Sequence, residues 1–262
     1  MFAPLNPPVK DWAGKRVWVI GASSGIGAAL ARRLIEAGAR VALSARNAAQ
    51  LAEVADVAGR APNVLQLPLD VSEPGALMGA STELWKCWGG VDAVFFVAAR
   101  YRPVRAWELD DEDVDATLRT NVAAVMHGCA AVLPGMLVQQ SGALVIVSSV
   151  AGYRGLPKAL VYGASKAALI NFAEALYMDV RPRGLGVHLV CPGFVETPLT
   201  AQNDFTMPAL ISADEAAGHI LGGLARGDFH IHFPKRFTGW LRVLRLLPYR
   251  MYFAAVRRMT GL

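Results

Sequence analysis

The sequence is poor in cysteine and has no CxxC pair. Its three cysteines, Cys87, Cys129 and Cys191, lie far apart in a chain of 262 residues. An odd number of isolated thiols supports neither a disulfide framework nor a cysteine-based metal site. We therefore expect reduced thiols in a cytoplasmic protein that holds no metal.

Long uncharged apolar runs and a leader pattern are also missing. No apolar run reaches about 18 residues without a charge, so the sequence predicts no transmembrane helix. The first ten residues, MFAPLNPPVK, lack the basic and apolar regions of a signal peptide. The chain has 26 Lys and Arg against 21 Asp and Glu, yet it has no nucleic-acid recognition motif. We expect no nucleic-acid partner.

Short apolar stretches alternate with segments of helical periodicity. Hydrophobic residues make up 54% of the chain, which suits strands that are covered on both faces. The alternation predicts right-handed βαβ units and therefore an α/β fold. We expect a Rossmann-type doubly wound parallel sheet of about seven strands with helices on both faces. The predicted strands are 16–20, 41–44, 64–69, 91–97, 144–147, 187–191 and 229–233.

The remaining periodic segments predict the helices and the domain limits. Residues 1–234 form one predicted domain, within which the proline-rich residues 1–14 form an N-terminal arm, and residues 235–262 are an extension. Pro134 should interrupt the long helical region in which it lies. The predicted helices are 28–37, 74–88, 111–139, 162–180 and 213–225.

A glycine-rich turn, Gly21-Ala-Ser-Ser-Gly25-Ile-Gly27, follows the first predicted strand and precedes a helix. Glycines let the backbone turn tightly and approach a pyrophosphate at the free N–H groups of a helix N-terminus. A simple strand–helix turn is the alternative. The predicted cofactor contacts here are Gly21, Ser23, Ser24, Gly25, Ile26 and Gly27.

The end of the second predicted strand indicates which dinucleotide is preferred. It reads Leu43-Ser44-Ala45-Arg46, without the carboxylate that would bind the ribose 2′-OH of NAD. Arg46 could accommodate a 2′-phosphate, so NADP(H) is favoured over NAD(H); a solvated loop cation is the alternative. Asp70 and Val71, after the third strand, could contact the adenine, although an isolated Asp also suits a helix cap.

Tyr162 and Lys166 are four residues apart on a predicted helix and therefore share one face. A strand end that carries Ser149 should open toward the same space. A nearby ammonium favours phenolate and would lower the pKa of the tyrosine. The alternative is a half-buried tyrosine beside a solvated lysine.

These motifs together, in this order, resemble the short-chain dehydrogenase/reductase family over about residues 14–233. The resemblance implies hydride transfer between NAD(P)H and a carbonyl or alcohol, and a homodimer or homotetramer. The residues that carry it are GASSGIG at 21–27, Asp70, Asn121 in RTNVA, Ser149, YGASK at 162–166 and CPGFVET at 191–197.

The resemblance also implies catalytic roles. Tyr162 would be the general acid or base, and Lys166 would lower its pKa and bind the nicotinamide ribose. Ser149 would orient the substrate oxygen; it lies thirteen residues before Tyr162, a spacing that favours it over the adjacent Ser148. Asn121 would hold a water that links Lys166 to solvent.

Further cofactor contacts follow from the same resemblance, together with two departures from the family pattern. Ile20 stands where the family usually has Thr, and 96–99 (Phe-Val-Ala-Ala) where it usually has Asn-Asn-Ala-Gly. The small alanines still allow the cofactor to approach closely. The remaining predicted contacts are Ala98, Pro192, Gly193, Val195 and Thr197.

The loop after Thr197 should cover the substrate. Phe205, Met207 and Leu210 would form an apolar lid, or they would pack down on the domain. An apolar lid without a charged clamp favours a small hydrophobic carbonyl or alcohol, including a lipid-like one.

The extension 235–262 carries seven Lys or Arg and no Asp or Glu. Pro248 should break it. A basic amphipathic helix either lies peripherally on the anionic inner membrane surface or packs on the domain or a partner subunit. Helical spacing places Arg242 and Arg245 opposite one broad apolar face made by Trp240, Leu241, Val243, Leu244 and Leu247.

The sequence therefore predicts an NADP(H)-dependent oxidoreductase that acts on an apolar carbonyl or secondary alcohol. The alternative is a regulatory protein that binds NADP(H) without catalysis. The complete set of Asn121, Ser149, Tyr162 and Lys166 favours the enzyme, because a sensor needs no proton relay.

Overall fold

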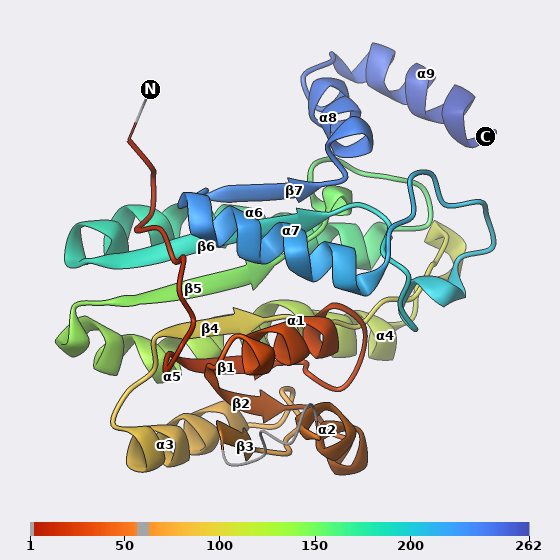
Figure 1. The fold of residues 1–262 in the computed structure, drawn as a ribbon. Helices are drawn as coiled ribbons and strands as arrows, with labels where there is room; N and C mark the ends of the chain where they lie inside the picture. The colour runs from red at the N-terminus through yellow and green to blue at the C-terminus, as the bar shows by residue number, and fades with distance from the viewer. Residues whose placement is uncertain (1–2, 57–62, 262) are drawn as a thin grey trace.

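The computed structural model describes residues 3–56 and 63–261. At its centre is a seven-stranded parallel sheet in the order β3-β2-β1-β4-β5-β6-β7 (Figure 1). This arrangement confirms the predicted Rossmann-type doubly wound sheet. The strands are β1 (Arg16–Ile20), β2 (Arg40–Ser44), β3 (Val64–Gln66), β4 (Ala93–Phe96), β5 (Gly142–Val147), β6 (Leu185–Pro192) and β7 (His230–Phe233).

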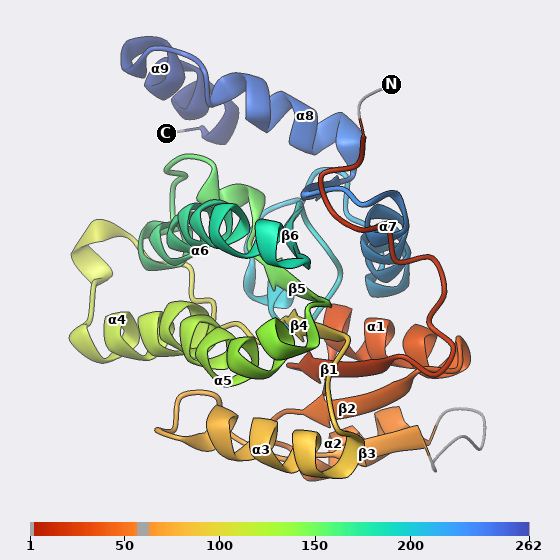
Figure 2. The same cartoon turned by 90° about the vertical axis from the view of Figure 1, so that its left-hand side faces the viewer.

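Helices cover both faces of the sheet (Figure 2). α1 (Gly25–Glu36) and α7 (Ala213–Arg226) pack on one face, and α3 (Ala76–Trp88), α5 (Ala124–Gln139) and α6 (Leu160–Val180) pack on the other. The central strands are buried on both sides, which explains their almost unbroken apolar sequences. A short helix that the sequence did not predict, α2 (Ala48–Ala55), begins where the Asn47 side chain accepts a hydrogen bond from Gln50 N.

The strand order reverses between β1 and β4, which lie side by side. β2 and β3 are added on one side of β1, and the chain then crosses back so that β4 lies on the opposite side of β1. Such a reversal leaves a crevice at the carboxyl ends of the strands, where open α/β sheets bind their ligands. The turn that starts at Gly21 follows the carboxyl end of β1 and borders this crevice.

The long helical region 111–139 is interrupted at a different place from the one predicted. Pro134 lies inside α5, and the irregularity is a π-helical turn, Arg119–Ala123, between α4 (Asp111–Leu118) and α5. A π turn accommodates an extra residue, and here it contains Asn121. The whole run is long and apolar enough to span a membrane by length and composition, and its α5 part packs against α3 and β5.

The N-terminal arm is held along β6 and α7. The side chain of Asn6 donates to Val187 O at 2.7 Å and accepts from Val187 N at 3.0 Å. The backbone N–H of Asn6 donates to Gly227 O. Trp12, near the end of the arm, is buried in the core.

Two helices form the C-terminal extension, α8 (Lys235–Leu244) and α9 (Tyr249–Thr260), and the chain turns between them at Pro248. Both views place them outside β7, the last strand of the sheet (Figures 1 and 2). Only one side of each helix can therefore pack on the domain.

The predicted single apolar face of this extension is divided in the structure. Leu244 is buried, with Leu241 and Leu247 packed against it. Trp240 and Val243 instead remain 68% and 55% exposed. The domain therefore covers only part of the predicted apolar face, and the rest of that face stays exposed.

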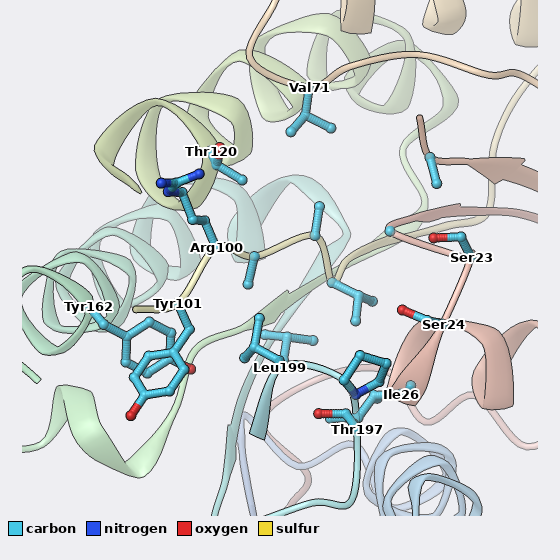
Figure 3. A pocket seen from close by; sticks show the side chains of 18 of the residues that line it. Ser23, Ser24, Ile26, Val71, Arg100, Tyr101, Thr120, Tyr162, Thr197 and Leu199 are labelled. Atoms are coloured by element: carbon cyan, nitrogen blue, oxygen red, sulfur yellow. The ribbon is translucent and has the colours of Figure 1, made fainter. Parts of the chain in front are cut away.

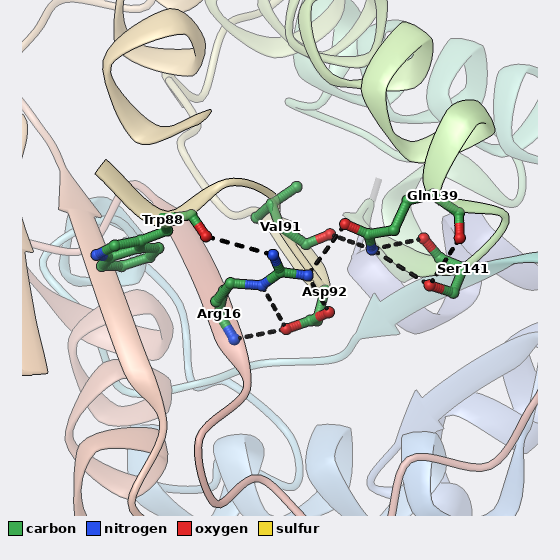
Figure 4. A network of polar contacts seen from close by, with 6 residues as sticks. All are labelled: Arg16, Trp88, Val91, Asp92, Gln139 and Ser141. Carbon is green, nitrogen blue, oxygen red and sulfur yellow. Dashed lines mark hydrogen bonds and ion pairs between the residues drawn. The ribbon is translucent and has the colours of Figure 1, made fainter. Parts of the chain in front are cut away.

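A polar network ties β1 to β4 at the amino ends of the strands (Figure 4). The carboxylate of Asp92 accepts hydrogen bonds from the backbone N–H of Arg16 at 2.8 Å and from its guanidinium at 3.0 and 2.8 Å. Gln139 accepts another guanidinium bond and donates to Val91 O. The Arg16 guanidinium holds the pKa of Asp92 below its usual value, although burial acts in the opposite direction.

We expect Asp92→Ala to destabilise the fold by about 2 kcal/mol, because it leaves a largely buried guanidinium without its partner. A thermal melt should show a lowered Tm. Asp214→Ala is the matched control, since its bidentate contact with Arg33 is more exposed and should matter much less. Equal losses in both variants would contradict this account.

Candidate active site

A cavity of about 930 Å³ opens at the carboxyl ends of the central strands. This volume suits a dinucleotide with a small substrate. In Figure 3, Ser23 and Ser24 lie on one side of the cavity and Tyr162 lies on the other. The predicted site residues that line it are Gly21, Ser23, Ser24, Gly25, Ile26, Arg46, Asp70, Val71, Ala98, Ser149, Tyr162, Lys166, Pro192, Gly193, Val195 and Thr197.

The glycine turn is built for close backbone approach. Gly21 has φ +95°, and a Cβ there would collide with the backbone of Ala98. A Cβ on Gly25 would come within 2.8 Å of Thr197 Cγ2. Gly27 does not line the cavity; a Cβ on it would collide with Gly21 O, so it allows the turn to close on itself. The open N-terminus of α1 that results fits a pyrophosphate.

The two departures from the family pattern leave the edge of the sheet intact. The backbone N–H groups of Val97 and Ala98 both donate to Ile20 O at 2.9 Å. The ends of β1 and β4 are therefore joined through the backbone and need no asparagine side chain. Ala98 and Ala99 line the cavity without filling it.

Arg46 and Asp70 face each other at the rim of the cavity. Arg46 Nη1 lies 4.0 Å from Asp70 Oδ2, and the Arg46 side chain is 82% exposed. Asp70 Oδ1 accepts from the backbone N–H and hydroxyl of Ser72, and these bonds, foremost that from the hydroxyl, keep its pKa low. Ser44, at the end of β2, is buried and accepts from Trp18 Nε1. No carboxylate directly follows β2 at residues 45–47, so Arg46 is the positively charged group that this strand end offers to a cofactor.

Lys166 is buried on α6 beneath Tyr162. Its Nζ donates to Val147 O at 2.9 Å and lies 5.6 Å from the centre of the Tyr162 ring. Burial lowers the pKa of this ammonium to about 8. The lysine is thus not the solvated cation of the alternative interpretation.

The pKa of Tyr162 is raised to about 12, with burial as the largest cause, and its hydrogen bond with Ser149 acts in the opposite direction. The expected lowering by Lys166 is not found in this structure, since an ammonium with a pKa near 8 has lost its charge before a phenol with a pKa near 12 ionises. A phenol with this pKa is protonated at neutral pH. It can therefore donate a proton, as the reduction of a carbonyl requires.

The structure separates the two candidate serines. Ser148 donates to Lys166 O at 2.7 Å and thereby holds β5 against α6. Ser149 accepts from Ala151 N at 3.1 Å and hydrogen-bonds Tyr162. Ser149 is the serine that can share a substrate oxygen with Tyr162.

The family model described as short chain dehydrogenase matches residues 15–207. The chain is a short-chain dehydrogenase. Over 242 residues it is 38% identical to an uncharacterized oxidoreductase of Myxococcus xanthus, covering 92% of this chain and 96% of that one. It is 32% identical to a 3-oxoacyl-[acyl-carrier-protein] reductase of Salmonella typhimurium, over 81% of this chain and 86% of that protein.

Two solved structures are similar to this short-chain dehydrogenase and differ in their dinucleotide. The short-chain dehydrogenase from Sphingobium yanoikuyae in complex with NADPH has a TM-score of 0.77 at 26% identity, covering 86% of this chain and 92% of that one. One from Burkholderia phymatum in complex with NAD has a TM-score of 0.80 at 25% identity, covering 89% and 94%. The family therefore supports a nicotinamide cofactor without deciding between the two.

Asn121 of this short-chain dehydrogenase is buried and does not line the cavity. Its Oδ1 accepts from Arg100 N at 2.7 Å, and its Nδ2 donates to Arg100 O and to the hydroxyl of Ser165. The residue thus fixes the segment after β4 to α6, which bears Tyr162. Its proposed part in a proton relay remains a prediction.

Tyr101 is a site residue that sequence reasoning missed. Its ring contacts that of Tyr162 edge to face, with centroids 4.8 Å apart (Figure 3). Its hydroxyl donates to Asn203 Oδ1 at 2.8 Å. Its sequence position, just beyond a strand end, was the only available signal. Tyr101 thus connects Tyr162 to the loop after Thr197.

That loop differs from the predicted apolar lid. Phe205, Met207 and Leu210 do not line the cavity, and Phe205 and Leu210 are 47% and 43% exposed. Phe205 packs instead on Phe194, outside the cavity. The residues that the loop gives to the cavity come from its first turn, which leads into the 3-10 helix Thr200–Gln202. They are Pro198, Leu199, Thr200 and Gln202.

Proposed function

We propose that this short-chain dehydrogenase is an NADP(H)-dependent oxidoreductase that acts on an apolar carbonyl or the corresponding secondary alcohol. The observation that carries the proposal is the placement of Ser149, Tyr162 and Lys166 in the same cavity as the glycine turn. A cofactor bound along the turn would bring its nicotinamide toward the tyrosine. The bound cofactor supplies the hydride.

The chain's own residues manage the substrate and the proton. Ser149 and Tyr162 would both hydrogen-bond the carbonyl oxygen, which fixes its position. Tyr162 Oη would donate a proton to that oxygen as negative charge develops on it. Lys166, with a pKa near 8, is suited to return a proton to the tyrosine at neutral pH.

The preference for NADP(H) rests on the rim at the end of β2. Arg46 is exposed there and no carboxylate follows the strand. A guanidinium can bind a phosphate through two parallel charge-assisted hydrogen bonds. The NADPH complex of the similar Sphingobium yanoikuyae structure is compatible with this preference.

We expect Arg46→Ala to weaken NADPH binding by about tenfold and to leave NADH binding unchanged, because only NADPH carries the 2′-phosphate. Titration followed by cofactor fluorescence measures both affinities. Arg183→Ala, which removes an exposed arginine outside the cavity, should leave both unchanged. A wild-type preference for NADH would overturn the choice of cofactor.

An apolar substrate is supported by the side chains near Tyr162. Leu199 and Pro198 line the cavity beside Tyr101. The 3-oxoacyl reductase to which the chain is similar reduces a carbonyl on an acyl chain, which is the same kind of group. A screen of ketones of increasing chain length, with NADPH oxidation as the readout, should show kcat/KM rising with length. A preference for charged or sugar carbonyls would contradict the proposal.

We further propose a cytoplasmic homodimer or homotetramer that forms through the helices bearing Asn121 and Tyr162. Exposed apolar side chains on these helices support the proposal, among them Val138 on α5 and Met178 on α6. Light scattering on the eluting protein gives the mass of the assembly. A monomer at micromolar concentration would exclude it.

A further inference from the structure

The C-terminal helix pair, α8 with α9, is joined firmly to the domain on its inner side. Leu244, Tyr252 and Val256 form a small buried cluster between the two helices. Phe237 and Leu241 pack against the main core. The pair is therefore a fixed part of the molecule and not a loose tail.

The outer side of the pair exposes large apolar side chains. On α8 and just after it, Trp240, Val243 and Leu246 are 68%, 55% and 81% exposed. Their spacing of three residues places them along one side of the helix. The exposed apolar residues of α9 are Tyr249, Met251, Phe253 and Met259. Large apolar side chains exposed together along one side of a helix, as Trp240, Val243 and Leu246 are, mark a candidate interaction site.

The same two helices carry exposed basic side chains. The segment 235–262 has seven Lys or Arg and no Asp or Glu. Arg250, Arg257 and Arg258 on α9 are exposed, as are Lys235 and Arg242 on α8. This part of the molecule therefore combines exposed apolar side chains with basic side chains and has no acidic ones.

We propose that the outer side of the C-terminal helix pair docks on an anionic lipid bilayer. Trp240, Val243 and Leu246 would enter the interface, while the arginines contact the lipid head groups. A second copy of the chain fits less well, because the same surface on both copies would bring like charges together. Trp240, with an apolar body and one polar N–H, belongs to the side chains enriched at membrane interfaces.

The docking surface is connected to the active site through Arg154, five residues after Ser149. Its guanidinium donates to Leu247 O at 2.6 Å and lies over the rings of Tyr249 and Tyr252, 4.7 and 4.0 Å from their centres. Tyr252 donates to Gly155 O at 2.6 Å. The segment that follows Ser149 is thus held by the helix pair.

A second connection runs through aromatic rings. Phe237 of α8 packs on Phe194, and Phe194 packs on Phe205. Phe205 belongs to the loop after Thr197, here called the substrate loop. Docking would therefore hold the substrate loop near the bilayer. This position near the bilayer would help catalysis only if the substrate is apolar, as proposed, and comes from the membrane. The docking itself does not depend on the identity of the substrate.

Flotation of the full-length protein with vesicles tests the proposal. We expect the protein to float with phosphatidylcholine vesicles that contain phosphatidylglycerol and to stay at the bottom with phosphatidylcholine alone. The triple variant Trp240→Ser, Val243→Ser, Leu246→Ser should lose at least about tenfold in vesicle affinity. Arg250→Gln with Arg257→Gln should lose about tenfold, and added salt should weaken the wild type.

Matched controls separate docking from general stickiness. Trp107→Ser, Met78→Ser, Leu109→Ser removes three apolar side chains that are 81%, 51% and 52% exposed outside the pair. It should float as the wild type does, as should Arg32→Gln with Arg183→Gln. NADPH titration of every variant shows that the fold is kept, and since flotation needs no substrate, failure of the proposed activity would not affect it.

Two results would overturn the proposal, and a light-scattering measurement would reassign the surface in the first case. The wild type could stay at the bottom with anionic vesicles, or the triple variant could float as well as the wild type. A wild type that binds no vesicles, with a triple variant of lower mass in light scattering, would assign the surface to a second copy of the chain.

Discussion

Replacing Tyr162 by Phe is expected to lower kcat by about a thousandfold while the affinity for NADPH stays unchanged. The variant removes only the hydroxyl that donates the proton, and general acid catalysis contributes on the order of 10²- to 10⁴-fold. The ring should keep its edge-to-face contact with Tyr101 and its place over Lys166. Single-turnover reduction and NADPH fluorescence titration give the two quantities separately.

Tyr101→Phe is the matched control, since it removes a second phenol from the same cavity. Its hydroxyl hydrogen-bonds Asn203 and does not face a reacting atom in our assignment. Activity should fall by less than about tenfold. A loss equal to that of Tyr162→Phe would mean that the acid has been misassigned. A wild type that binds NADPH and turns over no carbonyl in the screen would favour the non-catalytic regulator.

Gly27→Ala is expected to reduce the affinity for the dinucleotide by at least about a hundredfold. The added Cβ would collide with Gly21 O, so the turn must open. Displacing backbone donors by about 1 Å is enough to cost two orders of magnitude. The same opening separates α1 from β1, so a lowered Tm should accompany the loss.

Gly79→Ala tests whether the effect comes from the turn or from glycine replacement in general. Gly79 lies within α3, and a Cβ there would meet no atom within 4 Å. Alanine is the better helix former by about 1 kcal/mol, so Tm should rise slightly. NADPH affinity should be unchanged in this variant. If Gly27→Ala also bound NADPH normally, the turn would not be the pyrophosphate site.

Local sequence patterns were sufficient to predict the sheet and most of the cavity. Short apolar runs separated by helical periodicity identify the strands, and right-handed βαβ units make the sheet parallel. The positions of the glycine turn and of Ser149 follow, because each comes directly after a strand that ends at the same edge. Each of these features depends on residues that are close together along the chain, so it can be read from a single sequence.

Contacts between distant segments were not predictable. That Lys166 Nζ binds Val147 O depends on how α6 packs on β5, and the same packing buries both groups, which lowers the pKa of Lys166 and raises that of Tyr162. The contact of Tyr101 with Tyr162 depends on the path of the chain after β4. The π turn at Asn121 replaced the break expected at Pro134, since neighbouring packing decides whether a helix continues through a proline.

The C-terminal extension illustrates a related limit. Helical periodicity correctly gathered Leu241, Leu244 and Leu247, but it could not tell a side chain that meets the domain from one that remains exposed. Trp240 and Val243 lie next to this face and outside the contact. Only the structure shows which of these apolar side chains pack on the domain and which remain exposed.

The hydrogen bonds of Asn6 bear on the order in which parts of the protein fold during synthesis. Its side chain pairs with Val187, 181 residues later, and its backbone with Gly227. During synthesis Asn6 therefore leaves the ribosome well before β6 and the end of α7, which supply its partners. The segment around Asn6 can take its native place only after these later segments have been made and have folded.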